Sequence, residues 1–263
     1  MGTKDYVEKN NFKGVLIGSS GGIDSALTAA IAFDALGKGR VKTIMMPFDF
    51  TADISIEDAG SLAKNLGIEH SEISIKEMYE SFSLALKESF EGMGIDKTEE
   101  NLQSRCRGVT LMALSNKLGF LVLTTGNKSE AAVGYSTLYG DTAGGFSVLK
   151  DVSKTLVYEL ANYRNSLSVV IPKRIIERPP SAELAPDQKD TDSLPDYDRL
   201  DPIIEMYVED DKSIQEIINE GFDEKEVRRI VSLIDFNEYK RRQAPLGINC
   251  LLYTSPSPRD ATL

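Results

Sequence analysis

The sequence contains little of what several kinds of site require. Its 263 residues include one histidine, His70, and two cysteines, Cys106 and Cys250. A zinc site with several histidine ligands is therefore excluded, and a Ser-His-Asp triad would have to use His70, which no nucleophile-elbow pattern accompanies. The cysteines form no C-x-x-C pair and no disulfide framework. We therefore expect a reducing, cytoplasmic setting, with His70 an ordinary residue at a strand start and Cys106 in the core.

Long apolar runs and basic surface are also missing. No stretch of about 18 apolar residues occurs, so no membrane span is predicted, and the polar N-terminus lacks the apolar core of a signal peptide. The net charge of −11 argues against nucleic acid and against an anionic membrane as partners, because both need basic surface. It does not argue against a nucleotide, since a few backbone N–H groups and one or two lysines can hold a phosphate.

Short apolar segments alternate with helical periodicity through the first half of the chain. The predicted strands are 13–18, 41–48, 69–75 and 120–126, and the predicted helices are 23–37, 55–67, 76–90 and 98–118, with Ser55 and Asp58 as a capping pair. This alternation is typical of an α/β fold with a doubly wound parallel sheet. In such sheets ligands bind outside the carboxyl ends of the strands.

The second half has a different character. Two long segments, 134–151 and 177–202, show no clear period, and we expect them to be functional loops that close over a ligand. Helical patterns return at 202–208, 213–220 and 223–239, which predicts helices at the C-terminal end of the fold.

One domain is predicted over residues 1–248. The remaining 249–263 segment has no period and carries two Ser-Pro pairs. We expect this tail to be disordered or non-native, and no functional argument rests on it.

The turn GSSGGIDS, from Gly18 to Ser25, joins the first predicted strand to the first predicted helix. The first N–H groups of a helix have no partner within it, and the helix dipole is positive there. Gly21 and Gly22 have no Cβ, so an anion can approach the backbone closely. No lysine follows the glycines, and the string is not G-x-G-x-x-G, so neither the P-loop nor the dinucleotide fingerprint fits. The turn predicts a site for a phosphorylated ligand.

The string SSGGIDS resembles the pyrophosphate loop of the N-type ATP pyrophosphatases, a group that includes NAD synthetase, GMP synthetase, asparagine synthetase and several tRNA-thiolating enzymes. The segments ENLQSRCRG, LVLTTGNKSE, VGYSTLYGDTAGGFSVLKDVSKT, ERPPSAELAPDQKDTDSLPDYDRLD and YKRRQAP follow in order. Together they resemble the synthetase domain of NAD synthetase, most closely the glutamine-dependent bacterial form, over about residues 7–245. The resemblance implies a Rossmann-like sheet of the adenine nucleotide alpha hydrolase-like type.

The resemblance also implies a reaction. In that family ATP adenylates the carboxylate of deamido-NAD, pyrophosphate leaves, and ammonia then displaces AMP to give NAD, with Mg²⁺ as cofactor. By position in the motifs, Asp24 and Lys154 match catalytic residues, and Asp24 and Glu130 match Mg²⁺ ligands. The residues matching ATP contacts are Gly18, Ser19, Ser20, Gly21, Gly22, Ile23, Asp24, Ser25, Thr125, Lys154 and Ser181. Those matching deamido-NAD contacts are Asn101, Arg105, Glu130 and Lys240.

The family pattern also bears on partners. Glutamine-dependent members carry an N-terminal glutaminase domain, and this sequence starts too close to its first strand to hold one. We therefore expect ammonia from solution or from a glutaminase domain of the full-length protein, and a cytoplasmic homodimer or larger homo-oligomer. Two alternatives stay open on the sequence. One is another N-type ATP pyrophosphatase, of the GMP synthetase or tRNA-thiolation type, and the other is a non-catalytic adenine-nucleotide binding module.

Overall fold

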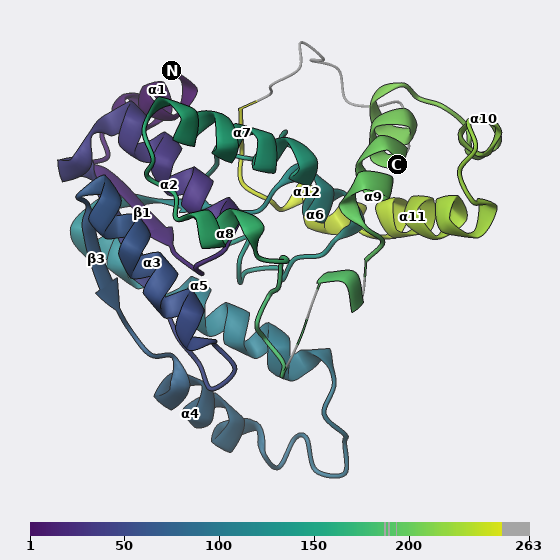
Figure 1. Cartoon of the computed structure of the whole chain (residues 1–263). Coiled ribbons are helices and arrows are strands. Elements are labelled where there is room, and N and C mark those ends of the chain that lie inside the picture. The colour runs from purple at the N-terminus through teal and green to yellow at the C-terminus, as the bar shows by residue number, and fades with distance from the viewer. Residues whose placement is uncertain (187, 189, 193, 249–263) are drawn as a thin grey trace.

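A five-stranded parallel sheet forms the centre of the molecule, in a computed structural model that describes residues 1–186, 188, 190–192 and 194–248. The strand order is β3-β2-β1-β4-β5, and every neighbouring pair is parallel (Figure 1). The strands are β1 Gly14–Gly18, β2 Val41–Met45, β3 Glu69–Glu72, β4 Phe120–Thr124 and β5 Phe146–Ser147. The predicted parallel α/β sheet is confirmed, since four of these strands lie within predicted segments.

The fifth strand was not predicted. It contains only two residues, too few to leave an alternating pattern, and it lies within the segment 134–151 that we expected to be a loop. Gly145 brings this strand alongside β4, because its amide donates to the carbonyl of Val122 at 2.9 Å.

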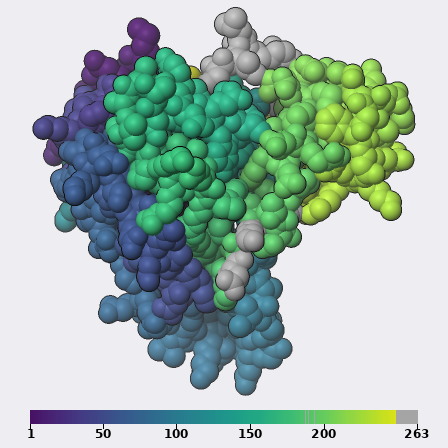
Figure 2. All heavy atoms as spheres, viewed as in Figure 1, coloured from purple at the N-terminus to yellow at the C-terminus, as the bar shows by residue number. Residues whose placement is uncertain are grey.

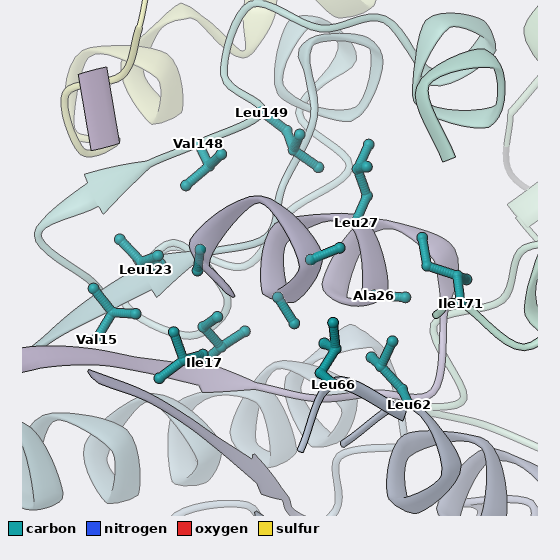
Figure 3. Packing of buried hydrophobic residues seen from close by; sticks show 14 of the residues in the cluster. Val15, Ile17, Ala26, Leu27, Leu62, Leu66, Leu123, Val148, Leu149 and Ile171 are labelled. Atoms are coloured by element: carbon teal, nitrogen blue, oxygen red, sulfur yellow. The ribbon is translucent and has the colours of Figure 1, made fainter. Parts of the chain in front are cut away.

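Helices cover both faces of the sheet. On one face α2 packs with α1, α3 and α7 around a core that includes Val15, Ile17 and Leu27 (Figure 3). On the other face α4 and α5 cover a second cluster that contains Leu16, Val122 and Cys106. The helices of this body are α1 Gly2–Lys9, α2 Ile23–Leu36, α3 Asp53–Leu66, α4 Lys76–Leu86, α5 Lys97–Leu118, α6 Lys128–Val133, α7 Lys154–Leu167 and α8 Lys173–Glu177, with a 3₁₀ turn at Lys38–Arg40.

Several local predictions can be compared with these elements. Cys106 is buried in the core as expected, and His70 lies second in β3, where its Nδ1 pairs with the Thr43 hydroxyl at 2.9 Å. The predicted capping pair at Ser55 and Asp58 is wrong. The helix begins at Asp53 after Ala52, so Ser55 is within the first turn and its hydroxyl bonds to another segment.

Helix α7 was also missed by the sequence patterns. Its buried residues are only Lys154, Val157 and Ala161. The apolar face of this helix is therefore narrow, and its sequence has no clear apolar periodicity. This helix begins at Lys154 and therefore fixes the backbone of a predicted site residue.

The C-terminal helices form a layer with its own core, which includes Ile203, Ile217 and Ile230. Figure 2 shows them projecting to one side of the α/β body. They are α9 Tyr197–Ile204, a π-helical turn Glu205–Glu209, α10 Ile214–Asn219, α11 Glu224–Phe236 and α12 Glu238–Arg242, preceded by a 3₁₀ turn at Asp190–Asp192. The predicted start at Pro202 is wrong, because Pro202 lies inside α9.

The predicted tail, 249–263, lies outside the described residues, and the domain boundary at 248 stays a prediction. Among the helices described, none is long and apolar enough to cross a membrane.

Candidate active site

The turn between β1 and α2 has the conformation that its glycines allow. Gly21 has a φ of +77°, and a Cβ built there would lie 2.3 Å from the backbone oxygen of Ser55. Only glycine tolerates both the left-handed backbone and this close approach of α3. Gly22 is the extended residue before α2, so the free amides at the start of that helix lie at the carboxyl end of β1.

Serine hydroxyls hold the turn in place. The amide of Ser20 donates to the Ser25 hydroxyl at 3.2 Å, and the amide of Gly22 donates to the Ser20 hydroxyl at 3.2 Å. The Ser25 hydroxyl in turn donates to the carbonyl of Gly22 at 3.0 Å. These bonds preform a concave turn before any ligand binds, as an anion site requires.

The turn borders a pocket of about 620 Å³ at the carboxyl edge of the sheet. The pocket is lined by all but one of the predicted site residues: Gly18, Ser19, Ser20, Gly21, Gly22, Ile23, Asp24, Ser25, Asn101, Thr125, Glu130, Lys154, Ser181 and Lys240. The exception is Arg105, whose side chain is turned away and donates through Nε to the carbonyl of Leu138 at 3.2 Å. A contact of Arg105 with deamido-NAD stays a prediction that the position of this side chain does not support.

A lysine lies between two carboxylates in the pocket, beside the glycine turn. Lys154 Nζ is 2.6 Å from Asp24 Oδ2 and 3.0 Å from Glu130 Oε1, and its ammonium lies 5.3 Å from the centre of the Tyr197 ring. The Lys154 side chain is only 2% exposed. The three residues come from the first turn of α2, from α6 and from the first residue of α7. The fold thus joins residues 130 positions apart in the sequence.

Burial and charge act against each other in this cluster. Burial alone lowers the pKa of Lys154, but the two carboxylates outweigh it, and the net pKa is raised well above its ordinary value. Burial raises the pKa of Glu130 to about 7; Lys154 opposes this rise and Asp24 adds to it. The lysine is therefore firmly charged, and burial makes Glu130 easier to protonate than an ordinary glutamate.

Asn127 links the Asp24 carboxylate to the backbone of Glu130. Its side chain is fully buried; Nδ2 donates to Asp24 Oδ1 at 2.9 Å and Oδ1 accepts from the amide of Glu130 at 3.0 Å. Asn127 is the N-cap of α6. One cap thus fixes the start of the helix that carries Glu130 and the direction of the Asp24 carboxylate.

The chemistry of this donor set fits Mg²⁺. Mg²⁺ in nucleotide sites takes one or two carboxylates and fills its remaining positions with phosphate and water oxygens. Asp24 and Glu130 supply two such carboxylates beside a turn suited to phosphates. Within the described residues no group of three or more His, Cys, Asp or Glu side chains could hold a metal. The pair therefore fits a metal that arrives with a phosphate ligand better than one held by protein alone.

A loop after α8 covers the glycine turn. Glu183, at a φ of +50°, accepts the Ser55 hydroxyl at 2.7 Å and the amide of Ala52 at 3.3 Å, while Arg178 donates to the Ser55 hydroxyl at 2.6 Å and pairs with Glu183. The Ser181 hydroxyl, in contrast, donates to the carbonyl of Gln188 within the same loop. The loop is thus fastened to the start of α3, where it lines the pocket.

Lys240 closes the opposite end of the pocket. Its Nζ donates to the carbonyls of Gly134 and Ser136 at 2.7 and 2.8 Å. Burial lowers the pKa of Lys240, an effect that nearby Asp141 partly offsets. Its bonds to carbonyls link α12 to the segment 134–136.

Arg107 was missed by the sequence reasoning and lines the pocket. Its Nε donates to the carbonyl of Met46 at 3.0 Å at the end of β2, and burial lowers the pKa of its guanidinium to about 10. The pocket face of α5 runs through Ser104, Arg107, Gly108 and Leu111, at helical spacing from Asn101. That spacing was the available signal, and it favours Arg107 over Arg105.

Comparison with known proteins identifies the family. Residues 2–244 match the family model described as NAD synthase. The chain belongs to the NAD synthase family. This membership decides against the GMP synthetase and tRNA-thiolation types.

Three relatives of this NAD synthase family chain illustrate the range of similarity. It is 57% identical over 249 residues to a glutamine-dependent NAD(+) synthetase of Acinetobacter baylyi, covering 94% of this chain and 46% of that one. A solved glutamine-dependent NAD+ synthetase of Acinetobacter baumannii, in complex with ADP, is 52% identical with a TM-score of 0.68 over 94% of this chain and 45% of that one. A solved NMN synthetase of Francisella tularensis is 30% identical with a TM-score of 0.76, covering 96% and 93%. The chain spans about half the length of the curated relatives it matches.

Proposed function

We propose that this chain catalyses the ATP-dependent amidation of deamido-NAD to NAD, as a ligase that forms a carbon–nitrogen bond. The observation that carries the proposal is the Lys154 ammonium held between Asp24 and Glu130, in the same pocket as the anion-binding turn. A reaction between a carboxylate and a polyphosphate brings negative charges together, so it needs a fixed positive charge and backbone donors at the point of attack.

In the first step a carboxylate oxygen of deamido-NAD attacks the α-phosphorus of ATP. A new P–O bond forms, the bond between the α-phosphorus and the bridging oxygen breaks, and pyrophosphate leaves with that electron pair. The free amides at the start of α2 receive the leaving pyrophosphate. Lys154 stays charged and stabilises the negative charge on the α-phosphate. Asp24 and Glu130 would hold Mg²⁺, which would supply further neutralisation of the negative charge on the leaving pyrophosphate.

In the second step ammonia attacks the acyl carbon of the adenylate. The C–N bond forms, the C–O bond to AMP breaks with its electron pair on the phosphate, and one proton leaves the nitrogen to solvent. Water competes for the same carbon, so the pocket must be closed during this step. The loop fastened by Glu183 and Arg178 covers the turn and suits this task.

The assignments to single residues are part of this proposal. The nucleotide is proposed to lie along Gly18–Ser25, with Thr125 and Ser181 nearby, consistent with the ADP complex solved for the Acinetobacter baumannii relative. Deamido-NAD is proposed to lie between Asn101 and Lys240, close to Glu130.

We also propose the partners of the reaction. The relatives named glutamine-dependent point to a glutaminase domain as the source of ammonia in the full-length protein. A cytoplasmic setting is proposed as well. A homodimer is proposed from exposed residues on α5, where Arg105, Val109 and Met112 form one stripe at helical spacing and the latter two are apolar.

The decisive experiment measures pyrophosphate release from Mg²⁺-ATP and NAD formation by the purified chain. Both are expected to require deamido-NAD, and NAD formation is also expected to require ammonium, with no product from glutamine. Nicotinate mononucleotide is tested in parallel because the Francisella tularensis relative is an NMN synthetase. Absence of pyrophosphate release with either substrate would contradict the proposal and favour a binding module.

A further inference from the structure

Asp201 lies outside the pocket yet joins the two helices that carry its charged residues. It belongs to α9, which packs against both α6 and α7 (Figure 1), and it is 8% exposed. Its Oδ1 accepts the hydroxyl of Ser129, and its Oδ2 accepts the amide and the hydroxyl of Thr155 at 2.9 and 2.8 Å. Each carboxylate oxygen therefore accepts hydrogen bonds from a different helix.

The two partners of Asp201 are the sequence neighbours of the charged pair. Ser129 directly precedes Glu130, and Thr155 directly follows Lys154. The Ser129 hydroxyl also accepts the amide of Lys154 at 2.8 Å. The side chains of Lys154 and Glu130 are 3.0 Å apart on the pocket side, while Asp201 joins their neighbours on the other side.

We propose that Asp201 is a positioning residue, which sets the separation of Lys154 and Glu130 by clamping the starts of α6 and α7. A buried carboxylate is costly unless donors satisfy it, and here the donors are an amide and two hydroxyls rather than a cation. In the described part of the chain no ion pair includes Asp201. Its charge also faces the positive end of α7. Only the kinetic test of this inference rests on the proposed function.

The test replaces Asp201 with asparagine in the full chain. A carboxamide has one acceptor oxygen, so it cannot serve Ser129 and Thr155 as the carboxylate does. We expect kcat for NAD synthesis to fall about 100-fold, the order that a misplacement of about 1 Å produces. The KM for ATP is expected to change less than kcat, because Asp201 has no hydrogen bond to the Gly18–Ser25 turn among the described residues.

Asp58→Asn is the matched control. Asp58 is also buried and also joins two helices, through Arg174 of α8, but it does not line the pocket. It is expected to lower the melting temperature with little effect on kcat. If Asp201→Asn loses no more kcat than Asp58→Asn at a comparable melting temperature, the proposal is wrong.

Ser129→Ala removes one arm of the clamp and tests the proposal if Asp201→Asn does not fold. We expect Ser129→Ala to lower kcat, whereas Ser115→Ala, which removes a buried hydroxyl bond to the carbonyl of Phe120, should not. Equal kcat values for these two alanine variants would overturn the clamp. In the double variant, Asp201→Asn should add less to Ser129→Ala than it costs the wild type. If the kcat losses of the two single variants simply multiply in the double variant, the clamp is also contradicted.

A structural readout keeps this test independent of the reaction. A crystal structure of Asp201→Asn, or of Ser129→Ala, is expected to show the Lys154 Nζ–Glu130 separation beyond hydrogen-bond range, about 3.5 Å. An unchanged separation would overturn the proposal even in an inactive protein. Conversely, a wild-type protein without NAD synthesis would contradict the proposed function and leave the structural comparison intact.

Discussion

Two lysines of this protein each lie between two carboxylates, and the two clusters face different surroundings. Lys154 pairs with Asp24 and Glu130, and Lys128, two residues before Glu130, pairs with Asp151 and Glu209. The Lys154 side chain is 2% exposed while its carboxylates are 18% exposed. The Lys128 side chain is 18% exposed, close to the 19% and 26% of its partners.

The difference lies in which member of each cluster faces the pocket. At Lys154 the cation is the innermost group and its carboxylates are more exposed to the pocket beside the glycine turn, where a metal could bind them. At Lys128 all three groups share a similar exposure, and Lys128 does not line that pocket. The same set of charges therefore faces the proposed substrate pocket in one place and ties α6 to neighbouring segments in the other.

Removing the lysine from each cluster gives the largest expected contrast. Lys154→Met leaves two carboxylates without a cation and takes positive charge from the pocket. We expect kcat to fall by about 10²–10³-fold and the free energy of unfolding to fall by about 3–5 kcal/mol. Lys128→Met should lower the free energy of unfolding by about 1 kcal/mol with kcat near wild type. Steady-state kinetics measures kcat, and urea unfolding measures the free energy of unfolding. Equal losses of kcat in Lys154→Met and Lys128→Met would contradict the difference between the two clusters.

Replacing one carboxylate in each cluster tests whether Glu130 is a Mg²⁺ ligand. Glu130→Gln keeps the shape of the side chain but loses a hard anionic ligand, so we expect kcat/KM at limiting Mg²⁺ to fall about 100-fold. Excess Mg²⁺ should restore part of this loss. Glu209→Gln serves as the control and should show the wild-type Mg²⁺ dependence. A Mg²⁺ titration in which the two variants coincide would remove Glu130 from the metal site.

The pH dependence of stability gives a contrast of intermediate size. The pKa of Glu130 is raised from 4.5 to about 7, so between these values the folded protein holds a proton that the unfolded chain has lost. The free energy of unfolding should therefore decrease as the pH rises through this window, with a slope for this group of at most about 1.4 kcal/mol per pH unit. Glu130→Gln should remove this component, and Glu209→Gln should keep it. Urea unfolding between pH 4.5 and 7 measures the slopes, and identical slopes would refute the assignment.

Added salt is expected to produce the smallest contrast. Mobile ions screen partly exposed charges more than buried ones. The stability difference between wild type and Lys128→Met should shrink by about 0.5 kcal/mol in high salt, while that for Lys154→Met should persist. Unfolding in low and high salt checks this, and a larger salt effect on Lys154→Met would mean that its cluster is open to solvent.

The parts of the fold that could be predicted from the sequence are those whose signal lies in consecutive residues. The Gly18–Ser25 turn and four of the strands are of this kind. The placement of Lys154 beside Asp24 is not, because it depends on contacts 130 positions apart, and only the family resemblance pointed to it. The Arg105 contact stays a prediction that the geometry does not support, since the pocket face of α5 passes through Arg107 instead. Asn127 carries a local N-cap signal but none for its bond to Asp24, and Asp201 carries no local signal, because its importance comes from the helices that it joins.

The clamp at Asp201 has a consequence for the order in which a growing polypeptide takes shape. Domains form from the N-terminal end as the ribosome releases the chain. The strands β1 to β4 are all released by Thr124, whereas the cation that neutralises Asp24 and Glu130 emerges at Lys154, and the carboxylate that clamps it follows 46 positions after Thr155. Until then, the chain lacks the cation and the clamp that hold Asp24 and Glu130 in place. The proposed reaction centre therefore cannot be complete before α9 is released, whereas β1 to β4 all precede it in the chain.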